Sequence, residues 1–586
     1  MMYTDEKVYQ IIISLFKEWG LKHCVLSAGS RNVPFVHSVE EDSFFKCYSV
    51  VDERNAAYFA MGMAQEIRQP VVISCTSSTA TCNYWPAVAE AFYQNIPLVV
   101  LTSDRDPAML HQWEDQMIDQ VGMYDRHVKK SVNLPIIQSE EDVYYAQRLI
   151  NEALIVVFKK KSGPVQINVP TRGYNFNFNT KNLLQTKKID YVTVEDTTMW
   201  ERKKIELMNA KKVMIISGQN SFVSDNLAAS IHEFEKKSNS CIVEEYMGNI
   251  PGENVLNISV CFDVRYMNRK EFEKYLPDIV ISFGGNIMAG VKEFLRMYSG
   301  RVSHWCINPE GEVVDTFKNI STVFHCSPEY FFGYYSKKLA GNNDRVYYNL
   351  VKQCIDRIQY PEFDYSNIYA IKNVVENIPE GSLLHLSINN SIRITNFFKL
   401  KKDVKVYANI GTHGIDGVLP SFLGQARCNS SRICFLIIGD LSFFYGMNAL
   451  AIKNINNNVH ILLLNNHGGE EFYYNGVWQN KNSDKHTTAR HNLVAKNWVE
   501  SNGFMYLSAH NKEDFDNQIQ AFLGVNDKPV LFEVFSEMSS DAKKIYDFYD
   551  LSRPREIKNE LLSKGKQGIK SIIGKDAYDK LKKIMK

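Results

Sequence analysis

Two apolar runs in the last third of the chain constrain its fold most, because each ends abruptly in polar residues. Residues 432–440 read RICFLIIGD, and residues 459–469 read VHILLLNNHGG. Apolar runs of this length are typical of strands that are buried on both faces of a parallel sheet. Polar residues that begin where such strands stop lie at the carboxyl edge of the sheet, where open α/β sheets bind ligands.

Similar runs recur along the chain and alternate with helical stretches, which predicts an α/β protein with parallel sheets. The predicted strands of the first two thirds include residues 23–30, 70–78, 97–105, 164–170, 213–218 and 278–285. A chain of 586 residues is too long for a single core. Polar stretches divide it into predicted domains at residues 1–185, 195–345 and 360–550, followed by a tail at 551–586.

Composition argues against several classes of function. The formal net charge of +1 provides no electrostatic basis for binding nucleic acid. No apolar run is long enough to span a bilayer, and the N-terminus MMYTDEKVYQ lacks the basic and apolar regions of a signal peptide. The 11 cysteines include no CxxC pair, so we expect reduced thiols in a cytoplasmic protein.

Asp440 and Asn466 follow two consecutive predicted strands, so their oxygens can face one pocket. A single carboxylate with neutral oxygen ligands suits Mg²⁺, which takes its other ligands from phosphates and water. Gly468 allows close approach of the backbone, so a neighbouring carbonyl can join the ligands. The helix predicted after Asp440 offers N–H groups to a diphosphate. Each residue alone is also explained as a helix cap or a turn residue, but the two together favour a metal and diphosphate site.

The GD and NN pair resembles the fingerprint of thiamine diphosphate enzymes, and the first domain carries an independent match. There, VVDERNAAYFAMGMAQ places Glu53 at the start of a helix, as in the pyrimidine-binding domain of these enzymes. A longer series of motifs runs along the chain, in the order SAGSRNVPF, DERNAAYFAMG, TSSTATCNYWPAVAEA, TSDRDP, QMIDQ, GPVQINVP, NNSI, GIDG, GDLSFFYGMNAL and NNHGG. On these motifs, the chain resembles more closely the family of 2-succinyl-5-enolpyruvyl-6-hydroxy-3-cyclohexene-1-carboxylate (SEPHCHC) synthases of menaquinone biosynthesis.

The resemblance implies pyrimidine-binding, middle and diphosphate-binding domains in a homodimer or homotetramer. Thiamine diphosphate and Mg²⁺ would lie between the first domain of one chain and the third domain of another. Glu53 is implied as the catalytic carboxylate that favours the imino tautomer of the aminopyrimidine. The implied metal ligands are Asp440, Asn466 and Gly468. The implied cofactor contacts are Thr76, Ser77, Ser78, Gly414, Ile415, Gly439, Leu441, Ser442 and Phe472, with Ile415 beneath the two rings. Without the flanking Gly414 and Gly417, Ile415 would be interpreted as an ordinary core residue, and a place in the core is also an alternative for Phe472.

The resemblance also implies substrate contacts. Ser30 and Arg31 would hold the carboxylate of the acceptor, since an arginine can bind such a group through two parallel hydrogen bonds. Arg105 and Gln116 would be further acceptor contacts, although the family has Asn where this chain has Asp115. SAGSR in place of the family's SPGSR is a smaller departure. The residues implied on the donor side are Ser391, Arg393, Thr395, Ile410 and His413.

Two arginines of the family, which meet the distal carboxylate of a 2-oxoglutarate donor, are missing. Aligning NNSIRITNFF places Thr395 at the first position, and aligning ANIGTHGIDG places Ile410 at the second. A basic pair in the middle domain is replaced by Gly290 and Val291. Burying a carboxylate without a partner costs on the order of several kcal/mol. Arg393 stands two residues early, which turns it by about 200° on a helix. We therefore expect a smaller or uncharged donor tail, with pyruvate first.

Several functions remain open. The leading one is a carboligase that decarboxylates a 2-oxo acid and transfers the remaining fragment to a small acceptor. A simple decarboxylase that releases an aldehyde would need a proton donor, for which His413 and His467 are candidates, and a true SEPHCHC synthase is a further alternative. A catalytically silent subunit that serves as an interaction module is the fourth, and the presence of Glu53, Asp440 and Asn466 argues against it. The identity of the acceptor and the pathway stay open.

The tail at residues 551–586 is rich in lysine. Apolar residues at helical spacing, among them Ile569, Ile573 and Leu581, predict a basic amphipathic helix. We expect this helix to pack on the body of the enzyme, and a role at a membrane surface or in binding a partner is the alternative.

Overall fold

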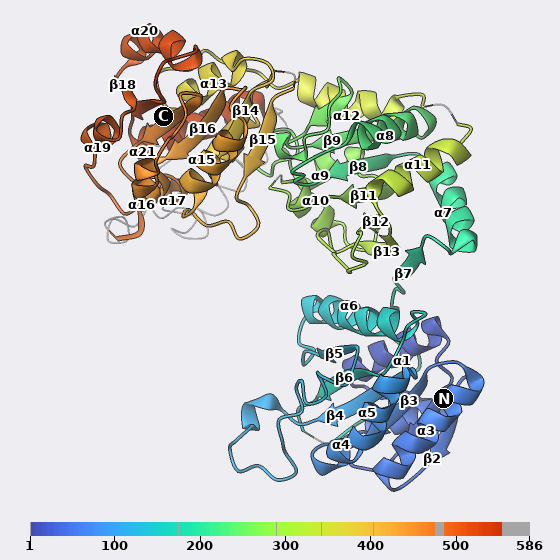
Figure 1. Cartoon of the computed structure of the whole chain (residues 1–586). Coiled ribbons are helices and arrows are strands. Elements are labelled where there is room, and N and C mark those ends of the chain that lie inside the picture. The colour runs from blue at the N-terminus through green and yellow to red at the C-terminus, as the bar shows by residue number, and fades with distance from the viewer. Residues whose placement is uncertain are drawn as a thin grey trace, which may run out of the picture. The chain divides into compact units, whose positions relative to one another are not determined.

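The structure, a computed structural model of the chain, describes residues 2–474 apart from 174, 289, 342 and 402, and residues 486–553. In these residues the strands form three sheets of six, seven and six strands (Figure 1). The chain divides into two compact units, one of residues 1–191 with 321–323 and one of residues 192–320 with those from 324 onward. The predicted α/β class is confirmed. The helix predicted in the tail lies outside the described residues.

The first unit contains a parallel six-stranded sheet. Its strands, in spatial order, are β2 (Lys46–Ser49), β1 (His23–Leu26), β3 (Val71–Cys75), β4 (Leu98–Asp104), β6 (Val165–Pro170) and β5 (Lys130–Asn133). The helices of this unit are α1 (Lys7–Trp19), α2 (Val33–Glu41), α3 (Glu53–Ile67), α4 (Thr79–Asn83), α5 (Trp85–Gln94), the 3₁₀ helix η1 (Pro107–Met109) and α6 (Glu140–Val157).

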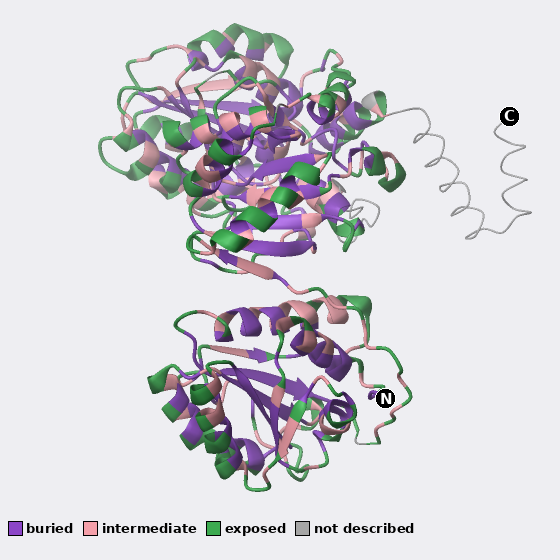
Figure 2. Ribbon diagram, turned by 90° about the vertical axis from the view of Figure 1, so that its right-hand side faces the viewer, coloured by how far each residue is buried: buried purple, intermediate pink, exposed green. Residues whose placement is uncertain are grey.

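Both faces of this sheet are buried. Val72 and Leu101 belong to a core cluster with α1, α2 and α6, whereas Ile73 and Val100 belong to a second cluster with α3 and α5. The central strands of the sheet are accordingly buried, and the exposed residues lie mainly on the helices and loops around them (Figure 2). Burial on both faces explains why the central strands β3 and β4 begin with unbroken apolar runs instead of alternating.

The middle part of the chain forms the seven-stranded sheet. The strand order is β10 (Val255–Asn257), β9 (Ser240–Glu244), β8 (Val213–Ser217), β11 (Ile279–Phe283), β12 (Ser303–Ile307), β13 (Ile320–His325) and β7 (Asp190–Thr193), with parallel pairing from β10 to β12. Its helices are α7 (Thr197–Asn209), α8 (Asp225–Lys237), η2 (Tyr246–Gly248), α9 (Arg269–Phe272), η3 (Glu273–Tyr275), α10 (Val291–Met297), α11 (Pro328–Lys338) and α12 (Val346–Asp356).

The last part of the chain forms a parallel six-stranded sheet. Its order is β15 (Lys405–Ala408), β14 (Leu383–Leu386), β16 (Cys434–Gly439), β17 (Val459–Asn465), β19 (Val530–Phe535) and β18 (Met505–Ala509). Its helices are α13 (Asn367–Asn377), α14 (Asn390–Thr395), α15 (Val418–Cys428), α16 (Asp440–Gly446), η4 (Met447–Ala451), α17 (Glu471–Tyr474), α19 (Lys496–Ser501), α20 (Lys512–Leu523) and α21 (Met538–Ser552). The two runs that constrain the fold most are β16 and β17.

The middle and last sheets share one hydrophobic core. A single cluster contains Ile216 and Val243 of the middle sheet together with Leu386 and Ile437 of the last sheet. Side-chain amides of the middle part also donate to the backbone of the last part, as Asn286 Nδ2 does to the Ile410 carbonyl at 2.7 Å. The interface between these two sheets is therefore built within one compact unit.

All eleven cysteines are thiols, as predicted, and most are buried. Of the helices in the described part of the chain, none has the length and apolar character needed to cross a bilayer.

Candidate active site

The carboxyl edge of the last sheet brings the predicted metal ligands together. β16 and β17 are adjacent, with Gly439 opposite Leu464, so Asp440 and Asn466 both follow the strand ends at this edge. Asp440 is 2 % exposed and is the first residue of α16. The loop after β17 folds back onto it, because the Gly468 amide donates to Asp440 Oδ2 at 2.9 Å.

Only glycine fits at position 468. Its φ of +151° lies in a region that other residues rarely adopt, and a Cβ there would stand 2.6 Å from the Thr488 carbonyl oxygen. The next amide, that of Gly469, donates to the same Thr488 oxygen at 2.7 Å. The NNHGG loop is thus held between Asp440 and the segment around Thr488.

The residues at this edge fit a magnesium ion. Asn466 donates from Nδ2 to Glu470 Oε2 at 2.9 Å, so its carbonyl oxygen is the atom left to face a metal. Asp440 supplies one carboxylate, and His491 Nε2 lies 3.2 Å from its Oδ2. No cluster of three His, Cys, Asp or Glu residues suited to a metal occurs among the described residues, so an ion here depends on amide and carbonyl oxygens. One carboxylate with neutral oxygens is the donor set that Mg²⁺ accepts when phosphates complete its shell.

Two buried carboxyl groups lie behind Asn466. Glu470 also accepts from Asn367 Nδ2 at 2.5 Å, and Asp541 accepts from the Asn367 amide at 3.1 Å. Burial raises the pKa of Asp541 to about 6. Asn466 is therefore tied to a buried polar network through Glu470, which shares Asn367 with Asp541.

The predicted cofactor contacts of the last domain surround the same edge. Gly439 precedes α16, and Leu441 donates from its amide to Asp440 Oδ1 at 2.6 Å. Ser442 Oγ donates to the Ile415 carbonyl at 2.5 Å, which joins the GIDG loop, with Gly414, to the start of α16. The Ile415 side chain is 38 % exposed, so it is not a core residue of the described chain. Phe472 lies against Gly469, where a Cβ would stand 3.0 Å from its ring.

In the first unit, Glu53 is the first residue of α3, whose N-cap is Asp52. Thr76, Ser77 and Ser78 follow β3 at the carboxyl edge of that sheet. Gly29 approaches this turn so closely that a Cβ would stand 2.3 Å from Thr76 Cβ. Ser78 has a φ of +72°, and Gln120 Oε1 accepts from its amide at 2.7 Å.

The predicted acceptor contacts are arranged around the same edge of the first sheet. Ser30 is exposed, and Arg31 is buried with its guanidinium donating to the Gly173 carbonyl. Arg105 forms ion pairs with Glu114 at 2.5 Å and with Asp115 at 3.2 Å. Asp115, the departure from the family, thus pairs with the arginine implied as an acceptor contact. Gln116 accepts through its backbone carbonyl from Ser77 Oγ at 3.1 Å.

The donor-side residues divide between two faces of α14. Ser391 and Thr395 are buried, as is Ile410 beyond β15. Arg393 lies on another face, where it pairs with Glu471. His413, with a φ of +59°, has Nε2 3.1 Å from Asn389 Oδ1.

The last sheet edge also holds residues that the sequence analysis did not identify. Glu470 contacts Asn466, and Glu471 contacts Arg393. His491 contacts Asp440. The two adjacent acidic residues directly after NNHGG are a visible signal for the first two. His491 has no such signal, because it reaches Asp440 from a distant segment.

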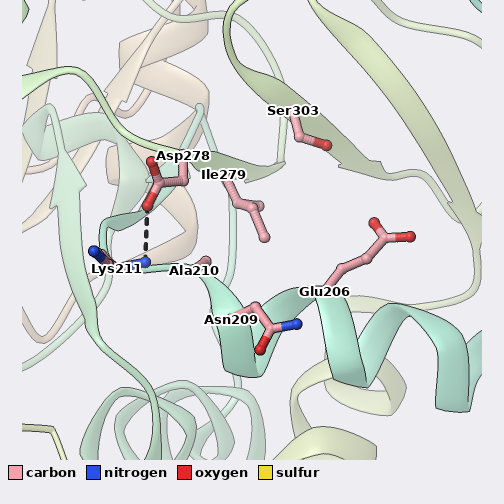
Figure 3. A pocket seen from close by; sticks show the side chains of 7 residues that line it. All are labelled: Glu206, Asn209, Ala210, Lys211, Asp278, Ile279 and Ser303. Atoms are coloured by element: carbon pink, nitrogen blue, oxygen red, sulfur yellow. Dashed lines mark hydrogen bonds between the residues drawn. The ribbon is translucent and has the colours of Figure 1, made fainter.

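A separate hollow of about 570 Å³ lies at the amino edge of the middle sheet (Figure 3). Lys211, Asp278 and Ser303 lie at or just before the starts of β8, β11 and β12, which is the amino edge. Asp278 Oδ2 accepts from the Lys211 amide at 2.8 Å, so this carboxylate holds the backbone just before β8. The hollow is therefore remote from the edge where α/β sheets bind ligands.

Comparison with known proteins gives a consistent result. The N-terminal TPP binding domain of thiamine pyrophosphate enzymes matches residues 6–123, and the C-terminal TPP binding domain of the same enzymes matches residues 389–534. A protein from Bacteroides thetaiotaomicron called 2-succinyl-5-enolpyruvyl-6-hydroxy-3-cyclohexene-1-carboxylate synthase is 36 % identical over 94 % of this chain and 99 % of its own length. Proteins of the same name from Bacteroides fragilis and Flavobacterium psychrophilum are 34 % and 31 % identical, over 94 % and 92 % of this chain and 99 % and 97 % of their own.

Three sheets flanked by helices, polar residues at the carboxyl edge of the last sheet, and matches to both cofactor domains define a thiamine-diphosphate-dependent enzyme. Within that class, the chain belongs to the SEPHCHC synthase family. The predicted family, enzyme class and organic cofactor are therefore confirmed. The roles of the individual site residues and the domain boundaries stay predictions.

Proposed function

We propose that this protein is a thiamine-diphosphate- and Mg²⁺-dependent carboligase that decarboxylates a small 2-oxo acid, with pyruvate as the first candidate, and transfers the remaining fragment to a small acceptor. Thiamine diphosphate supplies the electron sink for decarboxylation when it is bound. Asp440, Asn466 and the backbone next to Gly468 hold the metal. Glu53 holds the aminopyrimidine, and Arg31 binds the acceptor.

The ion pair of Arg393 with Glu471 is the main support for the proposed donor. Its Nη1 lies 3.0 Å from Glu471 Oε2, and its Nη2 lies 3.2 Å from Glu471 Oε1. Thr395 and Ile410 stand where the family has its two arginines, and both are buried. Arg393, the cation that could replace them, is thus already paired with a carboxylate. A donor whose tail needs no cation fits this arrangement better than 2-oxoglutarate does.

A panel of 2-oxo acids tests this proposal. Carbon dioxide release is measured with Mg²⁺ and thiamine diphosphate for pyruvate, 2-oxobutyrate and 2-oxoglutarate, each with and without candidate acceptors. We expect the highest kcat/KM with pyruvate and faster turnover when an acceptor is present. A clear preference for 2-oxoglutarate would overturn the proposed donor. Aldehyde release that no acceptor accelerates would favour a simple decarboxylase.

The second candidate function is SEPHCHC synthase itself, because relatives of that name match the chain over nearly its whole length. It requires that a cation in the donor site binds the distal carboxylate of 2-oxoglutarate. The same panel decides between the two functions.

A further inference from the structure

The ion pair between Arg393 and Glu471 has the geometry of a two-point clamp. Each terminal nitrogen of the guanidinium meets a different oxygen of the carboxylate, at 3.0 and 3.2 Å. The two side chains are 22 % and 28 % exposed, so the pair is shielded but not sealed from solvent. Both terminal nitrogens of the Arg393 guanidinium are hydrogen-bonded to one carboxylate. A second carboxylate therefore cannot form the same pair of hydrogen bonds with these nitrogens.

This clamp lines a cavity between the middle and last sheets. The cavity has a volume of about 370 Å³, and its lining includes Asn389, Arg393 and Glu471 from the last part and Gly290 and Glu293 from the middle part. Asn389 in turn contacts His413, a residue implied on the donor side. Through Asn389 and Arg393, the cavity therefore includes or contacts residues implied on the donor side.

The middle part cannot replace the missing cation at position 290. A Cβ on Gly290 would stand 2.6 Å from the Phe262 carbonyl oxygen and 3.0 Å from Asp263 Cα, so the backbone there excludes a side chain. Glu293 adds a further carboxylate to the lining. Arg265, the other arginine of the lining, donates to Asp263 from Nε at 2.8 Å and from Nη2 at 2.6 Å.

We propose that Glu471 is a positioning residue that determines donor specificity by withholding Arg393 from the carboxylate tail of a donor. With Glu471 in place, a second carboxylate entering the cavity meets an occupied guanidinium and the negative charge of Glu471. Repulsion of this kind against one substrate is a source of specificity in addition to attraction for another. This inference rests on the proposed function and identifies the residue that enforces it.

The test compares four variants with the wild type, using carbon dioxide release from pyruvate and from 2-oxoglutarate. Glu471→Gln removes the charge and weakens the clamp, and Glu471→Asp keeps the charge. The double variant Arg393→Met with Glu471→Gln removes the cation as well. Glu293→Gln is the matched control, because it makes the same charge change in the same cavity without touching the clamp. Thermal unfolding and thiamine diphosphate binding establish that each variant is folded and loaded.

In Glu471→Gln, we expect the ratio of kcat/KM for 2-oxoglutarate over pyruvate to rise about tenfold, the effect of one charge-assisted hydrogen bond. The change should lie mainly in the KM for 2-oxoglutarate. Glu471→Asp should keep the wild-type ratio, and the double variant should return to it. A ratio within about twofold of the wild type in Glu471→Gln would overturn the inference, as would an equal rise in Glu293→Gln or a rise that persists without Arg393. If the wild type itself prefers 2-oxoglutarate, the proposed function fails first, independently of the variants.

Discussion

Glu53 is the single residue on which activity should depend most. It is the first residue of α3, and its proposed partner is a nitrogen of the cofactor ring. Glu53→Gln should keep the fold and the affinity for thiamine diphosphate but lose roughly 10²- to 10⁴-fold in kcat, because an amide cannot take part in the proton transfer that sets the tautomer. Glu66→Gln, at the exposed end of the same helix, is the control. Activity within tenfold of the wild type would contradict the assigned role.

Glu470 should act on the metal through Asn466. It accepts the Asn466 amide hydrogen at 2.9 Å and so fixes which end of that amide faces the sheet edge. In Glu470→Ala we expect the affinity for Mg²⁺, measured calorimetrically with thiamine diphosphate present, to fall by roughly 10- to 100-fold, as for other residues that orient a metal ligand. Glu513→Ala, on the exposed first turn of α20, should leave that affinity unchanged. An unchanged Mg²⁺ affinity in a folded Glu470→Ala protein would refute this role.

At the scale of elements, the loop after β17 and the start of α16 should bind cofactor only as a unit with the metal. The loop contacts Asp440 through the Gly468 amide, and Asp440 is a buried carboxylate at this edge. A diphosphate therefore needs Mg²⁺ between itself and Asp440. Calorimetry in excess chelator should show no thiamine diphosphate binding, and restoring Mg²⁺ should restore it. Equal affinity in both conditions would rule out the metal bridge.

β14 carries a buried histidine that should make stability depend on pH. Burial lowers the pKa of His385 from 6.5 to about 4, and Nδ1 lies 2.8 Å from Gln425 Oε1. Between pH 6.5 and 4 the unfolded chain binds the proton that the folded chain excludes, so stability is lost as the pH falls through this window. The loss should reach roughly 2 kcal/mol at pH 5.

Urea unfolding at pH 7 and pH 5 measures this effect. His385→Gln should lose less stability between the two pH values than the wild type does, by about that amount. The same change at exposed His111 should leave the difference as it is in the wild type. An unaltered pH dependence in His385→Gln would show that other groups cause it.

At the scale of the whole molecule, the proposed active site needs two chains. We expect Glu53 of one chain and Asp440 of another to serve the same cofactor, which requires at least a dimer. Mixing inactive Glu53→Gln chains with inactive Asp440→Ala chains should restore up to about a quarter of wild-type activity through hybrid sites, on simple statistics of random pairing. If subunit exchange is demonstrated and no activity returns, both residues serve a site within one chain.

The α/β class, the strand positions and the cofactor class were determined by the sequence alone, because each depends on signals that are local in the chain. The runs at β16 and β17 are apolar because both of their faces are buried. Asp440 and Asn466 follow directly from where those strands end. Gly468 is recognisable from the sequence as a glycine in the loop after β17. Its backbone conformation is one that only glycine adopts readily.

Only the tertiary structure decided what the side chains around these positions contact. Arg393 and Glu471 are 78 residues apart in the chain, and no periodicity connects them. Whether Arg393 was free to bind a substrate could therefore not be predicted, although its position on the helix could. His491 contacts Asp440, although the two residues are also far apart in the chain. Burial affects many successive residues of a strand, so it leaves a pattern of apolar residues in the sequence. A single long-range ion pair depends on how separate segments meet, so it leaves no such pattern.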